Sequence, residues 1–256
     1  MPSIRVIGGG RAGGSVHGAL VAAGWTSGGV LGRHDAPSAA AHGVDLLVLA
    51  TPDGSLAEVA ASVVPVASTV VAHLSGATGL DVLADHPSRA SVHPLVSLPD
   101  PETGAQRLQG AWFALAGRSP AGQSSAGQSS ALDLVRRLVD DLGGRAVTVA
   151  DDDRTTYHAA AVVASNHLVA LLGQVERLAA SVGVPLEAFL DLAAGSLDNV
   201  RAVGPAAALT GPAARGDEAT IAAHLAALPP DERATYEALV VEARRLAGGH
   251  AGGQTP

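Results

Sequence analysis

The chain has 256 residues, a formal net charge of −8 at pH 7 and no cysteine. The acidic balance argues against a nucleic-acid partner, because phosphate binding needs a basic face. The lack of cysteine excludes disulfide scaffolds, thiol nucleophiles and thiolate metal sites, and we expect no metal site. All 16 residues of the Lys and Arg class are arginines, which removes lysine as a catalytic group.

The first residues, MPSIRVIGGG, lead directly into a predicted strand and lack the pattern of a signal peptide. No segment has the roughly 18 consecutive apolar residues that are typical of a membrane span. We therefore expect a cytoplasmic protein without a membrane partner.

Short apolar runs predict strands at residues 3–7, 28–32, 45–50, 68–74, 89–93, 111–117 and 145–150. Helix-like segments lie between several of them, and Val/Leu strands alternating with helices indicate a parallel sheet covered on both faces. Helical patterns dominate the rest of the chain. We expect a Rossmann-type α/β domain over residues 1–150 and an all-helical domain for substrate binding and dimerisation over residues 151–248.

Two tracts fall outside this pattern. Residues 119–130 contain AGQSS twice in tandem, which predicts a flexible surface insertion. Residues 249–256 are rich in glycine, and we expect a disordered tail.

The first strand ends in a glycine motif that fits a dinucleotide. Gly8, Gly10 and Gly13 form G-x-G-x-x-G between a strand and a helix. Gly8 would permit a tight turn, Gly10 a close approach of the pyrophosphate, and Gly13 close packing of helix on strand. The amides around Arg11 and Ala12 would then face the phosphates. The alternative is a tight turn without a ligand.

The end of the second strand predicts the cofactor. Arginine at this place accommodates the 2′-phosphate of NADP, whereas an acidic residue would bind the ribose of NAD. Arg33 holds this place, and Asp35, two residues later, is expected to cap the next helix. The sequence favours NADP over NAD, unless Arg33 is only a solvated surface charge.

Loops after later strands leave the same edge of the sheet, where ligands bind in open α/β folds. Thr51 and Pro52 follow the third strand and are expected to border the cofactor. Ser75 and His93 lie at the ends of the next two strands and are expected to border the reaction site. Asp53 follows Pro52, and we weigh a role in the site evenly against a structural role as a helix N-cap.

The stretch YHAAAVVASNHLVALL, residues 157–172, predicts a buried helix with polar residues in an apolar background. At about 100° per residue, His158 and Ser165 share a face and Asn166 lies at its margin, while His167 points elsewhere. Buried polar groups need partners, so the face would line a substrate cavity or form a core network.

Several segments together resemble a known bacterial family. They are ATPD (50–53), HLSGATGLDVL (73–83), HPL (93–95), YHAAAVVASNHLVAL (157–171) and GPAAALTGPAARGD (204–217). The chain resembles the Rossmann-like family with the domain of unknown function 2520. That family is similar to the superfamily of 6-phosphogluconate dehydrogenase, ketopantoate reductase and pyrroline-5-carboxylate reductase. The resemblance implies a Rossmann domain, a helical C-terminal domain and a nicotinamide cofactor.

The resemblance carries over to the site only in part. Ketopantoate reductases have a lysine where this helix has His158, and an asparagine where it has Val162, while Asn166 matches their last asparagine. Histidine can also donate a proton near neutral pH. The loop ALTGPAARGD resembles a segment that closes the substrate side, so Thr210 and Arg215 would bind substrate, with Arg215 holding a carboxylate or remaining a surface charge.

These observations predict an NADP(H)-dependent oxidoreductase that acts on CH–OH or CH–NH groups. The first expected substrate is a small carbonyl compound such as a 2-oxo acid, for example ketopantoate. His158 would donate the proton, with Ser165 and Asn166 orienting the substrate oxygen. An imine reductase of the pyrroline-5-carboxylate type, or a non-catalytic NADP-binding sensor, stays open. Superfamily members usually pair through the helical domain, so we also expect a homodimer.

Overall fold

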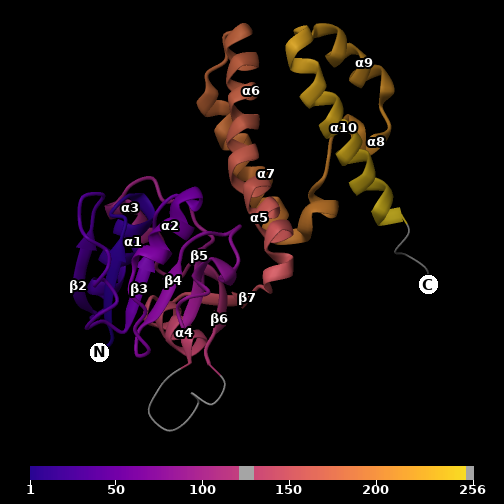
Figure 1. Cartoon of the computed structure of the whole chain (residues 1–256). Coiled ribbons are helices and arrows are strands. Elements are labelled where there is room, and N and C mark those ends of the chain that lie inside the picture. Colours follow the sequence, from indigo (N-terminus) through magenta and orange to yellow (C-terminus); the bar gives the residue numbers. More distant parts are fainter. Residues whose placement is uncertain (121–129, 252–256) are drawn as a thin grey trace. The chain divides into compact units, whose positions relative to one another are not determined.

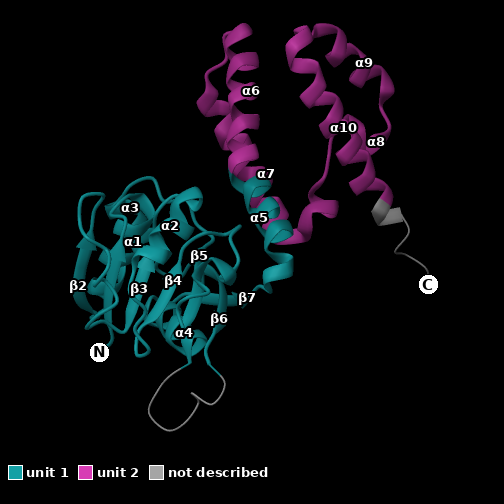
Figure 2. Cartoon of the chain, viewed as in Figure 1, with its two compact units in different colours: residues 1–165 teal, residues 166–256 magenta. Residues whose placement is uncertain are grey.

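The computed structural model describes residues 1–120 and 130–251. The chain forms two compact units, Met1–Ser165 and Asn166–Pro256 (Figure 2). This division lies beyond the domain boundary predicted after residue 150, because the first turns of the following helix bind the sheet-containing unit through Arg154 and Tyr157. The expected flexible insertion lies largely outside the described residues.

The first unit contains one sheet with the strand order β2-β1-β3-β4-β5-β6-β7 (Figure 1). The strands are β1 Ser3–Ile7, β2 Thr26–Leu31, β3 Leu46–Leu49, β4 Val70–His73, β5 Arg89–Pro94, β6 Trp112–Arg118 and β7 Arg145–Thr148. Each of them overlaps a strand predicted from the sequence. The chain passes from β1 to β2 on one side and then to β3 on the other, so the crevice for a ligand is expected beyond the carboxyl ends of β1 and β3.

The sheet is mostly parallel, with one reversal that the sequence pattern did not predict. β6 runs antiparallel to β5, and β7 runs parallel to β6. The connecting helix α3 (Pro101–Arg107) packs against α1 (Arg11–Ala22) and does not return the chain to the opposite end of the sheet. β6 therefore starts beside the end of β5, where Phe113 pairs with Pro94.

Alternate residues along the central strands enter two separate cores. Val70 and Ala72 join the core covered by α1 and α4 (Ala131–Asp141). Val71 joins the core covered by α2 (Leu56–Ser62) and the 3-10 turn η2 (Leu80–Leu83). Both faces are therefore covered, as the apolar strand sequences predict.

Helices follow the sheet, as expected. They are the 3-10 turn η3 Asp151–Asp153, α5 Arg154–Val162, the π-helical turn η4 Val163–His167, α6 Leu168–Ser181, α7 Leu186–Ala208, α8 Pro212–Arg215, α9 Glu218–Ala227 and α10 Pro230–Ala251. Because α10 continues to Ala251, the tail expected to be disordered from residue 249 begins as helix. The rest of that tail lies outside the described residues.

The helical stretch 157–172, which was predicted to be buried, is largely exposed in the isolated chain. Ser165, Asn166 and His167 are all exposed. They lie in the π-helical turn, where the wider i→i+5 bonding replaces the 100° step on which the predicted shared face depended. The prediction of burial was wrong for the single chain, because apolar composition alone does not show what covers a helix.

The stretch Asp151–Ser181 is long and apolar enough to cross a membrane by length and composition alone, with a hydropathy of 1.3. It begins with residues that bind the sheet-containing unit, including Arg154 and Tyr157. That contact is typical of a helix of a globular protein. The absence of a membrane partner stays a prediction.

Candidate functional site

The glycine turn after β1 has the geometry that the motif requires. Gly8 has φ +101°, and a Cβ there would lie 2.7 Å from the Ala50 carbonyl oxygen. A Cβ at Gly13 would lie 2.0 Å from the Gly8 carbonyl oxygen, so helix and strand pack as closely as expected. A Cβ at Gly10, in contrast, would meet nothing within 4 Å. The turn is closely packed at Gly8 and Gly13 and open at Gly10, which leaves room for a phosphate group.

Helix α1 starts directly at this turn, with Arg11 and Ala12 in its first turn. No side chain caps it, and its first turn has no acidic residue. The first amides of a helix lack intrahelical partners and carry partial positive charge, so they favour an anion. Arg11 is exposed there, although a cation opposes the helix dipole, which is consistent with an anionic partner.

Two further features beyond the end of β3 fit a dinucleotide. Thr51 follows β3, and its Oγ1 is buried with no hydrogen-bond partner among the described residues. The backbone amide of Thr51 lies beside Gly8, 3.3 Å from the position of a Cβ there, and Pro52 directly precedes the 3-10 turn η1 (Asp53–Ser55). The residues present therefore fit a dinucleotide at this turn.

Beyond the end of β2, Arg33 is exposed and has no ion pair or hydrogen bond with any other described residue. The carboxylate of Asp35 accepts a hydrogen bond from the Gly32 amide at 2.6 Å, so it stabilises the turn itself and no following helix. Of the two, Arg33 is the residue available for a ligand phosphate.

A polar cluster lies at the carboxyl ends of β4 and β5. Strand alternation places His73, Ser91 and His93 on one face of the sheet, opposite to Val92. His73 and Ser91 are register partners, and both are fully buried. The Ser91 hydroxyl has no hydrogen-bond partner within the described parts of the chain.

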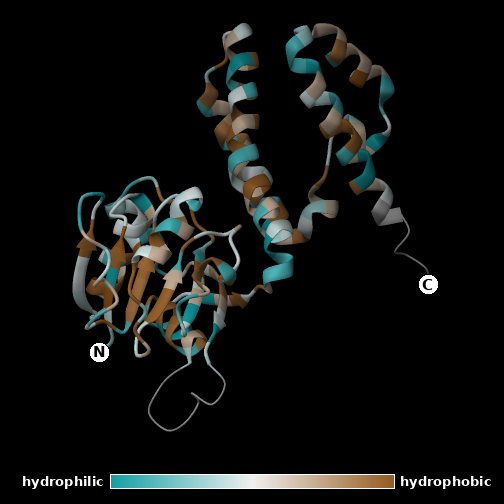
Figure 3. Cartoon of the chain, in the orientation of Figure 1, coloured by the Kyte–Doolittle hydropathy of each residue, from teal (hydrophilic) through white to brown (hydrophobic). Residues whose placement is uncertain are grey.

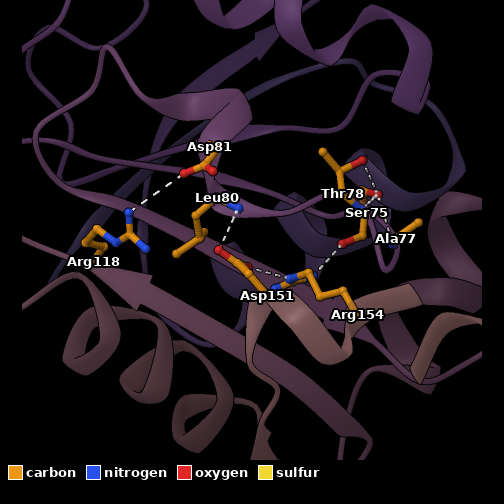
Figure 4. Close-up of polar contacts among 8 residues, drawn as sticks. All are labelled: Ser75, Ala77, Thr78, Leu80, Asp81, Arg118, Asp151 and Arg154. Carbon is orange, nitrogen blue, oxygen red and sulfur yellow. Dashed lines mark hydrogen bonds and ion pairs between the residues drawn. The ribbon is translucent and has the colours of Figure 1, made fainter. Parts of the chain in front are cut away.

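The loop after β4 contains Ser75, two residues beyond His73, and Figure 4 shows Ser75 with the neighbouring Ala77 and Thr78. The Ser75 hydroxyl donates to the Asp53 carboxylate at 2.8 Å and accepts from the amides of Ala77 and Thr78. Asp53 therefore binds the loop after β4, and its side chain caps no helix. Ser75 is engaged in shaping the loop.

The rings of Tyr157 and His158 both contact the ring of His93. His93 Nδ1 lies 2.6 Å from the Tyr157 hydroxyl, and the two rings are edge to face. The rings of His93 and His158 are also edge to face, with centroids 6.1 Å apart. A Cβ at Gly76 would lie 2.8 Å from His158 Cδ2 and 2.9 Å from His93 Cε1. The predicted residues His93 and His158 are thus neighbours, and only glycine at position 76 leaves room for both.

Arg154 holds the start of α5 against the sheet-containing unit, a contact that the sequence interpretation missed. Its side chain is 1% exposed, its Nε donates to the Asp151 carboxylate at 3.1 Å, and its Nη1 lies 3.4 Å from the Ser75 carbonyl oxygen. Asp151 also accepts from the Leu80 amide. Figure 4 shows this chain of contacts from the loop after β4 to α5. The signal available in the sequence was an arginine at the start of an apolar helix.

Burial and charge determine the protonation of the cluster. Burial, together with the positive charge of Arg154, lowers the pKa of His73 to about 4. Burial, His158 and Arg154 lower the pKa of His93 to about 4, against a small opposing effect of Asp53. Burial raises the pKa of Tyr157 to about 12. His73, His93 and Tyr157 are therefore neutral at pH 7.

Other predicted site residues are not joined to this cluster by the contacts described. The Ser165 hydroxyl donates to the Ala161 carbonyl oxygen of its own helix at 2.7 Å. Asn166 begins the second unit, which also contains Thr210 and Arg215, both exposed. Arg215 directly precedes the left-handed Gly216 at the end of α8. The roles expected of these four residues stay predictions.

Comparison with known families supports the family expected from the sequence. Residues 124–243 match the family described as Domain of unknown function (DUF2520), and residues 32–99 match the Rossmann-like domain. The resemblance predicted from the sequence motifs is confirmed. Among curated proteins, none matches this sequence.

Solved structures show the same fold over nearly the whole chain. A Bacteroides fragilis protein named as an NADP oxidoreductase is similar with a TM-score of 0.76 and 19% identity, over 95% of this chain and 98% of that one. A reductive aminase from Aspergillus terreus, in complex with a reduced nicotinamide cofactor, has a TM-score of 0.67 and 16% identity, over 96% and 94%. Pyrroline carboxylate reductase from Plasmodium falciparum with NADP bound has a TM-score of 0.62 and 13% identity, over 96% and 95%. At these identities the likeness establishes the fold, which is the predicted Rossmann domain followed by helices.

Proposed function

We propose that the protein is a cytoplasmic NADP(H)-dependent oxidoreductase that reduces a small carbonyl compound. The observation that carries the proposal is the contact of His93 with both Tyr157 and His158, in the same unit as the glycine turn. The names of the similar structures support a nicotinamide cofactor. A cytoplasmic location fits because such a reductase needs the cellular pool of NADPH.

The cofactor would be held by the glycine turn. Gly8 and Gly13 form the turn, and Gly10 with the first amides of α1 leaves an open, electropositive place for the pyrophosphate. Arg33 would bind the 2′-phosphate by charge-assisted hydrogen bonds. Bound there, NADPH would supply the hydride.

His158 would supply the proton. A carbonyl oxygen gains negative charge as hydride reaches the carbon, and a histidine near neutral pH is suited to protonate it. His93, whose pKa burial, His158 and Arg154 lower to about 4, is neutral at pH 7, and its ring lies edge to face with that of His158. A 2-oxo acid such as ketopantoate is the first substrate to test, with Arg215 proposed to bind its carboxylate.

Two alternatives have observations in their favour. The names of two similar structures, a reductive aminase and a pyrroline carboxylate reductase, favour an imine as substrate. The absence of lysine from the chain favours a sensor that binds NADP without catalysis.

One experiment separates these functions. The purified protein is mixed with NADPH and a panel of 2-oxo acids and cyclic imines, and loss of NADPH absorbance is followed, while cofactor binding is measured by titration. Turnover of an oxo acid supports the proposal, and turnover of imines alone supports the imine reductase. Tight NADPH binding without any turnover supports the sensor. Failure to bind either NADPH or NADH contradicts the carbonyl reductase, the imine reductase and the sensor.

A further inference from the structure

The hydrogen bond between Tyr157 and His93 has a donor and an acceptor that the surrounding residues determine. The Tyr157 hydroxyl and His93 Nδ1 are 2.6 Å apart, which is a short hydrogen bond. His93 Nε2 has no hydrogen-bond partner in the described parts of the chain, and His93 is only half-buried. One ring nitrogen is therefore engaged, and the other is available to a ligand.

Both partners are neutral at pH 7, because burial lowers the pKa of His93 to about 4 and raises that of Tyr157 to about 12. A neutral imidazole has one N–H and one bare nitrogen. A phenol is the better donor and an imidazole nitrogen the better acceptor, so the hydroxyl of Tyr157 donates to Nδ1. The ring proton of His93 must then be on Nε2.

We propose that Tyr157 is a positioning residue that fixes the tautomer of His93, so that His93 Nε2–H donates a hydrogen bond to the reacting oxygen of the substrate beside His158. This inference rests on the proposed function. The carbonyl carbon receives the hydride, the oxygen receives one proton from His158, and the proton of His93 stays on its ring. Tyr157 gives up no proton, and it prevents Nε2 from presenting a lone pair to a developing negative charge.

The packing of the cluster keeps this arrangement in place. Gly76 has no side chain, and any Cβ there would contact His93 at both Cε1 and Nδ1, at 2.9 and 3.0 Å. Burial, His158 and the buried guanidinium of Arg154 lower the pKa of His93 and so favour its neutral form. The charged and titratable groups that act on His93 are His158 and Arg154, both from α5, and Asp53, which acts in the opposite direction.

The chain contains a matched control. The Tyr236 hydroxyl lies 2.7 Å from His224 Nδ1, and those rings are also edge to face, with centroids 5.8 Å apart. That pair is exposed and joins α9 to α10. Tyr236→Phe removes the same kind of hydrogen bond as Tyr157→Phe, in the other unit.

Nitrogen NMR of the protein labelled at histidine with ¹⁵N tests the inference without any substrate. Protonated and bare ring nitrogens have well separated shifts, and the signals missing in His93→Gln identify His93. In the wild type we expect a bare Nδ1 and a protonated Nε2 at His93, and in Tyr157→Phe a mixture of the two tautomers. Tyr236→Phe should leave the His93 signals unchanged. A proton on Nδ1 in the wild type, or an unchanged His93 in Tyr157→Phe, would overturn the assignment.

Kinetics supply the second measurement. Loss of one donor to a developing oxyanion typically lowers kcat by roughly 10²–10³-fold, so His93→Ala should show such a loss. His93→Gln keeps an N–H near the position of Nε2 and should recover most of it, whereas Tyr157→Phe should lower kcat several-fold with the KM for NADPH unchanged. Equal losses in His93→Ala and His93→Gln would contradict the donor role. If no substrate is turned over at all, the proposed function fails, while the NMR result still decides the tautomer.

Discussion

The two units of the chain differ in how much of their apolar surface they bury. In the sheet-containing unit, all four residues of β3 and all four of β4 are buried. In the second unit, the 23-residue helix α7 has no buried residue at all. Figure 3 shows hydrophobic residues along the central strands and also along the helices α6 and α7. Hydrophobic sequence therefore predicts an element, and it does not show whether the same chain covers it.

This contrast has a physical consequence for each unit. The sheet-containing unit has two closed cores and the polar cluster, so its site can be tested by local substitutions with little change in folding. The second unit relies on a few polar contacts, such as those of Arg177 with the Glu232 carboxylate and of Gln174 with the Glu232 carbonyl oxygen. Its exposed apolar side chains are expected to be covered by a second copy of the chain.

The largest expected effect is the loss of turnover in His158→Ala. Removing a general acid lowers kcat by roughly 10²–10⁴-fold, while NADPH binding and thermal stability should not change, because the glycine turn and Arg33 hold the cofactor. His167→Ala, in the exposed π-helical turn, is the control and should retain turnover. If the residue instead supports a core network, the variant is destabilised by about 1–3 kcal/mol and its folded fraction keeps full activity.

The second prediction concerns the exposed face of α7. Leu192 and Val203 are 65% and 58% exposed, and if they lie in a homodimer interface, Leu192→Asp with Val203→Asp should weaken the dimer by about 100-fold. Val64→Asp, at a side chain 52% exposed on the sheet-containing unit, should leave the dimer intact. Light scattering at micromolar concentration measures both.

A wild-type particle of 25.3 kDa would contradict the dimer. Binding of such a monomer to lipid vesicles would assign the apolar helices to a membrane, which the composition of Asp151–Ser181 permits.

The fold was largely predictable from sequence, and the reasons are local. Strand runs such as 45–50, and the glycine turn between the first strand and the first helix, act over a few residues. The reversal at β6 was not predictable, because it depends on where α3 packs. The π-helical turn at Val163–His167 was not predictable either, and it invalidated the regular projection of Ser165.

The site was predictable at its strand ends and less so on its helix. Ser75 and His93 lie at the carboxyl ends of neighbouring strands, and parallel strands end at one edge, so their proximity followed from topology. His158 was found as a polar residue in an apolar helix, and the resemblance to ketopantoate reductases gave its expected role. Tyr157 and Arg154 were missed, because their importance depends on contacts with residues more than 60 positions away in the chain.

The third prediction is Arg33→Asp. Loss of a charge-assisted contact costs about 1.5–3 kcal/mol, so NADPH affinity should fall by roughly 10–100-fold while NADH affinity stays unchanged or rises. Arg136→Asp, an exposed arginine on α4, makes the same change of net charge and should have no effect on either affinity. Equal or tighter binding of NADH than NADPH by the wild type would refute the assignment of NADP.

The smallest expected effect is the pH dependence of stability in the sheet-containing unit. The pKa values of His73 and His93 are lowered to about 4 in the folded state, so below the unfolded value of about 6.5 the unfolded chain binds protons that the folded chain does not. Their contribution to stability is complete above that pH and is lost as the pH falls toward 4. Between pH 7 and pH 6 the free energy of unfolding should decrease by about 1 kcal/mol, a range in which carboxylates do not titrate. Both tryptophans, Trp25 and Trp112, lie in this unit, so their fluorescence in a denaturant titration reports it alone. His93→Gln should reduce the decrease by about half, and a stability that rises on acidification would show that these histidines are not held neutral.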